Sequence, residues 1–138
     1  MTALIGKTAR WAQLLYALML LFVGFVGVWT ARTEIQLIFR LQVESWPPDV
    51  AATFLNQYRF LKGLECGAGI FCVVFHSQIM EGGSHALTFV AIVLLGILGR
   101  TVAWIADGRP SALFLIFLAL EIFVLGVFVL NARMKNVA

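Results

Sequence analysis

The sequence predicts an all-α fold: a polytopic membrane protein with a four-transmembrane-helix bundle and an interfacial segment after the first helix. Composition carries the first part of this prediction, because 62% of the 138 residues are hydrophobic and only 12% are charged, whereas soluble domains carry about 25% charged residues. Several apolar runs are also long enough to cross about 30 Å of hydrocarbon as helices. The length predicts a single domain, residues 1–138.

The four predicted helices cover residues 11–30, 50–76, 85–106 and 111–131. A cleaved signal peptide is the alternative for the first, but Trp29 stands where the cleavage site needs a small residue, so we expect the helix to be retained. Asp49 follows two prolines and is a candidate N-cap for the second helix. A polar turn at 77–84 and the turn Asp107-Gly-Arg-Pro would separate the last three helices.

Residues 31–48 are the least regular part of the chain. Between Ile35 and Glu44, apolar and mostly polar residues alternate, which is typical of a strand. No other part of the sequence alternates in this way, and a lone strand would have unpaired edges. An interfacial helix, or an extension of the first helix, is therefore the preferred interpretation, with Trp46 at the headgroup level and Pro47-Pro48 ending the segment.

The basic residues near the two ends of the chain predict its orientation. They are Lys7, Arg10, Arg133 and Lys135. Cytoplasmic segments of membrane proteins carry an excess of Lys and Arg, so we expect a multi-pass protein of the cell inner membrane with both termini cytoplasmic. This placement also accounts for the net charge of +3 without a nucleic-acid partner.

Charged and polar residues inside the predicted helices form a candidate ligand-binding or structural cluster. They are Asn56, Arg59, Lys62, Glu65, Arg100 and Glu121. A charge at the bilayer centre costs about 2.5–3.5 kcal/mol on insertion scales, so such residues rarely lack a role. Two roles stay open: ion pairs that fix the register of the bundle, or a site for a ligand, a lipid or a proton.

Helix rise and phase predict how this cluster is arranged. Arg59 and Arg100 lie at similar depths and point inward, where Glu121 can lie between them. Lys62 and Glu65 are three residues apart and can pair on another face. Small residues on the same faces predict close helix packing at Gly63, Gly67 and Gly96.

No recognised catalytic, phosphate-binding or zinc motif occurs in the sequence, so we expect no catalytic residue, metal or cofactor. His76 and His85 flank the predicted turn near Glu81, and ordinary interfacial roles are favoured over a metal site. Cys66 and Cys72 are about 9 Å apart along one predicted helix, too far for a disulfide.

One set of motifs resembles a known family. It comprises Asn56-x-x-Arg59, Gly63-x-Glu65-x-Gly67-x-Gly69, Arg100, Asp107-Gly108-Arg109-Pro110 and Glu121. Over residues 50–130, this order resembles the bacterial membrane-protein family called domain of unknown function 4345, although many relatives carry serine at the position of Ala103. The resemblance implies a four-helix integral membrane protein and no particular activity. The chain is also loosely similar to small DoxX-like four-helix proteins, which suggests a quinone or redox association.

These observations favour a non-catalytic accessory or structural subunit of a larger membrane complex, with segment 31–52 as the docking element. The alternative is a protein that binds or transports a lipid, a quinone or another small molecule through the Arg/Glu cluster. A small redox enzyme is the third possibility and lacks a ligand set. The expected partners are the lipid bilayer and other membrane-protein subunits, with no nucleic acid.

Overall fold

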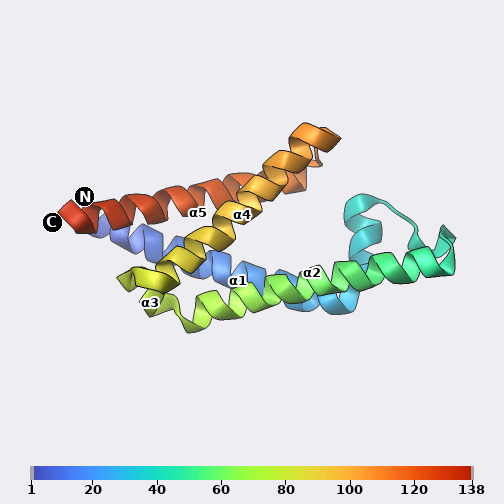
Figure 1. Ribbon diagram of the computed structural model, residues 1–138, viewed down its shortest axis with the longest axis horizontal. Coiled ribbons are helices and arrows are strands. Elements are labelled where there is room, and N and C mark those ends of the chain that lie inside the picture. The colour runs from blue at the N-terminus through green and yellow to red at the C-terminus, as the bar shows by residue number, and fades with distance from the viewer. Residues whose placement is uncertain (1, 138) are drawn as a thin grey trace. The chain divides into compact units, whose positions relative to one another are not determined.

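The computed structural model describes residues 2–137, and every regular element in that range is helical (Figure 1). The elements in order are α1 (Thr2–Glu34), the π-helical turn η1 (Ile35–Phe39), the 3-10 turn η2 (Val43–Ser45), α2 (Pro48–Val74), α3 (His76–Glu81), α4 (Gly83–Asp107) and α5 (Ala112–Val137). The predicted all-α fold class is confirmed for this part of the chain.

Three segments within residues 2–137 are long and apolar enough to cross a membrane. They are Ala3–Phe39, Gly83–Asp107 and Ala112–Lys135. α2 is not among them, since every 18-residue stretch of it contains Arg59, Lys62 and Glu65. The structure therefore supports a membrane protein, while a four-helix membrane bundle stays a prediction.

The segment after the first predicted helix extends that helix. α1 continues to Glu34 with a break in helical geometry at Thr30 (φ −97°, ψ 15°). The Thr30 hydroxyl donates a hydrogen bond to the Val26 carbonyl at 2.9 Å, a back-bond that commonly bends helices. η1 ends at Arg40, whose φ of 57° is left-handed. The alternation over 35–44 therefore forms no strand.

Two local predictions are wrong. Asp49 is not the N-cap of α2, because the helix begins at Pro48 and Asp49 lies in its first turn. A proline fits there since the first N–H groups of a helix have no intrahelical partner. The polar stretch 77–84 is mostly not a turn either, because α3 takes up its first part and the chain turns only at Gly82 and Gly83, both with positive φ.

Contacts within the chain divide it into two compact units, here called unit 1 (residues 1–16 and 74–138) and unit 2 (residues 17–73). In unit 1, α4 and α5 run side by side (Figure 1). The fully buried Phe89 of α4 packs edge-on against Phe128 of α5 and Tyr16 of α1, at centroid distances of 5.0 and 6.4 Å. The start of α1 lies beside the end of α5, since a Cβ on Gly6 would lie 3.4 Å from Asn131 Oδ1.

Unit 2 is held by close contact between α1 and α2. A Cβ on Gly24 would lie 2.7 Å from Cys66 Cα, and a Cβ on Gly69 would lie 2.7 Å from Leu21 Cα. Neither position can hold a larger residue unless the helices separate. Beyond this contact, the segment after α1 folds back on α2 through a cluster of buried side chains, namely Ala31, Ile35, Val43, Ala51 and Leu55.

The glycines that were predicted to pack helices behave differently from one another. A Cβ on Gly63 or on Gly67 would meet no heavy atom within 4 Å, so these two positions make no close helix contact within residues 2–137. Gly96 does lie in a contact, because its Cβ would be 3.4 Å from Glu121 Oε1. Helical spacing alone could not predict whether α2 contacts α1 through Gly63 and Gly67 or through Gly69.

Candidate functional site

Arg100 of α4 and Glu121 of α5 form an ion pair inside unit 1. Arg100 Nε lies 3.0 Å from Glu121 Oε2 and 3.2 Å from Oε1. The Glu121 side chain is 5% exposed and that of Arg100 is 31% exposed. Gly96, one turn before Arg100, leaves room for the carboxylate beside α4. The structure thus pairs two residues of the predicted polar cluster.

Aromatic rings on α5 flank the same guanidinium group. Arg100 Cζ lies 5.8 Å from the ring centroid of Phe114 and 5.5 Å from that of Phe117. A cation over an aromatic face gains about 0.5–1 kcal/mol when exposed and about 2 kcal/mol when desolvated. Two rings and one carboxylate therefore fix the position of the Arg100 head group.

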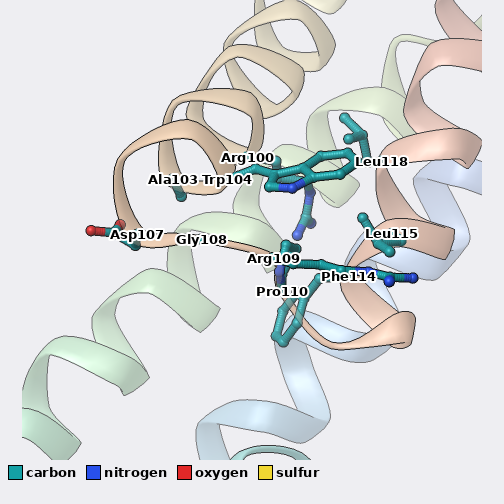
Figure 2. Close-up of a pocket in the computed structure, with 10 residues that line it drawn as sticks. All are labelled: Arg100, Ala103, Trp104, Asp107, Gly108, Arg109, Pro110, Phe114, Leu115 and Leu118. Carbon is teal, nitrogen blue, oxygen red and sulfur yellow. The ribbon is translucent and has the colours of Figure 1, made fainter.

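A cavity of about 290 Å³ lies beside this pair, where the turn between α4 and α5 meets both helices. Its lining residues are Arg100, Ala103, Trp104, Asp107, Gly108, Arg109, Pro110, Phe114, Leu115 and Leu118. Figure 2 shows the Arg100 guanidinium pointing toward the turn that carries Arg109, whereas the Asp107 carboxylate points away from the other lining side chains. The cavity therefore combines cationic groups with apolar walls.

The cationic groups of the cavity keep unused hydrogen-bond donors. Arg100 uses Nε for Glu121, and its terminal Nη groups donate no hydrogen bond within residues 2–137. Arg109 is exposed and forms no ion pair in the same part of the chain. A guanidinium carries five N–H donors in a fork that matches a carboxylate or a phosphate, so this cavity can receive an anion.

A second polar cluster lies in unit 2, around Lys62. Lys62 Nζ lies 3.1 Å from Glu65 Oε2 and 3.7 Å from Glu34 Oε2, and the Lys62 side chain is 14% exposed. Tyr58 donates its hydroxyl to Glu34 Oε2 at 2.7 Å. The predicted Lys62–Glu65 pair is therefore present. Sequence reasoning missed Glu34 and Tyr58 because it assigned Glu34 to the segment after the first helix.

Arg59 and Asn56 lie on a more open part of unit 2. Arg59 Nε donates to the Val28 carbonyl at 3.2 Å, and both residues line a shallow cavity with Arg32. Arg59 belongs to unit 2, whereas Arg100 and Glu121 belong to unit 1. A shared cluster of Arg59, Arg100 and Glu121 stays a prediction.

Neither histidine belongs to a metal-binding group among the described residues. The His76 ring is hydrogen-bonded through Nδ1 to Gln13 Oε1. The His85 ring stacks on Phe75 with a centroid distance of 4.9 Å. Cys66 and Cys72 are not joined by a disulfide, and Cys72 is buried.

Comparison with known proteins gives one match. No curated protein and no solved structure matches the chain. The family model described as Domain of unknown function (DUF4345) matches residues 8–131, a range that includes Glu34, Lys62, Arg100, Arg109 and Glu121. The likeness to DoxX-like proteins and the bacterial origin stay predictions. Because the match covers most of the sequence, the chain belongs to the DUF4345 family.

Proposed function

We propose that this chain is an integral membrane protein that binds a small amphiphile with an anionic head in the cavity between α4 and α5. The observation that carries the proposal is the pair of arginines, Arg100 and Arg109, which line an otherwise largely apolar cavity with unused donors. The half-buried Arg100 guanidinium keeps N–H donors beyond the Nε that Glu121 accepts, and an anionic ligand could accept from them.

The lining suits an amphiphile better than a purely polar anion. Trp104, Leu115 and Leu118 offer an apolar wall to hydrocarbon, while the arginines offer a fork to a carboxylate or phosphate oxygen. The volume, about 290 Å³, is at the small end of ligand sites, which run from about 300 to 1,000 Å³. The cavity would therefore hold the head and the first carbons of the ligand, with the rest in the bilayer.

The proposal assumes a four-helix membrane arrangement with both termini on the cytoplasmic face of the inner membrane. Support for the fourth span comes from the register of α1 against α2, in which Lys62 lies beside Gly27. Trp11 and Trp29 bound about 27 Å of α1, close to the hydrocarbon thickness. Lys62 is then near the membrane surface, where a charge costs little. The span after it would need α3 in addition to residues 63–74 of α2, which cover about 18 Å.

An accessory role in a larger membrane complex is the second candidate, and one observation favours it. Gly24, Gly27 and Gly69 are all used in the close contact between α1 and α2, whereas Gly63 and Gly67 are open. Two glycines four residues apart allow a transmembrane helix of another subunit to approach closely. Native mass spectrometry of gently extracted protein would reveal such a complex, while a free monomer carrying a stoichiometric amphiphile would exclude it.

Binding of a fluorescent fatty acid to the purified full chain tests the first proposal. Arg109→Gln should weaken binding about tenfold or more, as a lost hydrogen bond to a charged group does. Arg100→Lys should weaken it as well, since an ammonium keeps the charge and loses the fork. Arg133→Gln, an equal change of charge outside the cavity, is the control. Unchanged affinity in both cavity variants would contradict the proposal.

A further inference from the structure

A second cationic cavity lies in unit 1, at the other end of α4 from the cavity between α4 and α5. It has a volume of about 460 Å³ and is lined by Lys7, Arg10, Trp11, Leu14 and His76. The first four share one face of α1, because residues three, four and seven apart lie above one another on a helix. His76 is the first residue of α3, which directly precedes α4.

The charges at this end of unit 1 are strongly unbalanced. Lys7 and Arg10 are exposed and form no ion pair or hydrogen bond in the part of the chain that the structure describes. The end of α5, which lies beside the start of α1, adds Arg133 and Lys135. Glu81 of α3 is the only carboxylate within residues 2–16, 76–83 and 131–135. Within residues 2–137, no carboxylate therefore pairs with the Lys7 and Arg10 cations of this cavity.

The His76 side chain, which lines the cavity from α3, is held in place by a hydrogen bond. Gln13 is fully buried, and its Oε1 accepts a hydrogen bond from His76 Nδ1. With Nδ1 donating to Gln13, the ring can also donate to a phosphate oxygen through Nε2 in its imidazolium form, in which both ring nitrogens carry hydrogen. The end of α3 is fixed as well, because Lys135 Nζ donates to the Met80 carbonyl at 2.6 Å. His76 is thus a fixed wall facing the two flexible cations of α1.

The apolar part of the lining indicates what kind of anion fits. Trp11 is 64% exposed, and tryptophan is enriched at the headgroup level of membranes. Leu14 lies one turn deeper along α1, in the direction of the apolar run. We infer that this cavity binds the phosphate group of an anionic membrane phospholipid, with Lys7, Arg10 and His76 around the phosphate and Trp11 and Leu14 along the start of an acyl chain.

This inference does not depend on the amphiphile site between α4 and α5. The two cavities share no residue, so variants can separate them. Each Lys or Arg near a membrane surface contributes about 1 kcal/mol to attraction of anionic lipid. Removing both charges should therefore weaken binding about thirtyfold, because every 1.4 kcal/mol is a factor of ten.

The test measures phosphatidylglycerol retained by the full-length protein after reconstitution in phosphatidylcholine nanodiscs, read by native mass spectrometry. Lys7→Gln/Arg10→Gln should lose about thirtyfold in affinity. The single-charge controls Arg133→Gln and Arg40→Gln, each outside both cavities, should retain the lipid. The single variant Arg10→Gln replaces the double variant if the latter does not fold, with an expected loss of about fivefold.

Inorganic phosphate, added in excess, distinguishes a lipid site from a free-anion site. Phosphate lacks the acyl chain that Trp11 and Leu14 would contact, so the lipid should remain bound. Complete displacement by phosphate would overturn the inference in favour of a free-anion site. A loss in Arg133→Gln as large as that in the double variant would also overturn it, because the attraction would then belong to the whole basic surface.

Discussion

Glu121 buries its carboxylate against Arg100, whose Nε reaches both carboxylate oxygens at 3.0 and 3.2 Å. Because the carboxylate is the more buried partner, loss of the arginine should cost more than loss of the acid. Arg100→Gln should destabilise the protein by about 3–5 kcal/mol, as breaking a buried pair does, and Glu121→Gln by less. Thermal unfolding in detergent measures both.

A matched control for this prediction exists in unit 2. Glu44 pairs with Arg32 at 3.4 Å, with both side chains more than half exposed. Exposed pairs contribute about 0–1 kcal/mol, so Glu44→Gln should leave the unfolding temperature nearly unchanged. If Arg100→Gln lowered the unfolding temperature as little as Glu44→Gln, the ion pair between Arg100 and Glu121 would not stabilise the fold.

Glycine substitutions on α1 and α2 should have opposite effects at different positions. Gly24→Ala places a methyl group 2.8 Å from the Lys62 carbonyl oxygen and 2.7 Å from Cys66 Cα, so the helices have to separate and the lost packing should cost about 1–3 kcal/mol. Gly63→Ala meets open space and should gain up to about 1 kcal/mol of helix stability. Unfolding curves of the two variants check the prediction. Equal effects would contradict the α1–α2 register.

The sequence predicted the three longest apolar helices and residues of one ion pair in each unit. Apolar run lengths predicted α1, α4 and α5, because crossing a membrane demands long uninterrupted apolar helices. The Lys62–Glu65 pair followed from helical spacing. Residue counting placed Glu121 between Arg59 and Arg100, and the structure pairs it with Arg100. These predictions depend on local geometry that a single helix or a short turn determines.

Contacts between elements distant in the sequence could not be predicted in the same way. Gly63 and Gly67 have the spacing of a packing motif, yet Gly24 and Gly69 make the contact, because the rotation of α2 about its axis depends on all its neighbours at once. The hydrogen bond between Tyr58 and Glu34 could be predicted only with the knowledge that α1 continues past Thr30. To predict the cavity lined by Lys7, Arg10 and His76, one would have to know that α1 contacts α3, and no residue spacing in the sequence indicates this contact.

The hydrogen bond from Tyr58 to Glu34 can be measured by a double-mutant cycle. The hydroxyl donates to a carboxylate at 2.7 Å, and hydrogen bonds to charged groups contribute about 1.5–3 kcal/mol. Tyr58→Phe and Glu34→Gln should each destabilise unit 2, and the coupling energy between them should be about 1–2 kcal/mol. Chemical unfolding of the four proteins in the cycle yields this energy. Additive effects would mean that the end of α1 does not reach Tyr58.

Arg40 has a left-handed backbone conformation, with φ at 57°, where the chain leaves η1. For a residue with a Cβ, this conformation costs about 1–2 kcal/mol relative to glycine, which adopts it freely. Arg40→Gly should therefore raise the free energy of unfolding by about 0.5–1 kcal/mol, after part of the gain is offset by the greater flexibility of the unfolded chain. Thermal unfolding in detergent is the measurement.

Substitution of Arg32 by glycine should have the opposite effect, so it controls for the loss of an arginine charge. Arg32 lies inside α1 in helical conformation, where glycine costs about 1 kcal/mol, and its exposed pair with Glu44 adds little. Arg32→Gly should lower the unfolding temperature while Arg40→Gly raises it. If both variants shifted the temperature in the same direction, charge would dominate, and the left-handed turn at Arg40 would not be the feature that ends the helical extension of α1.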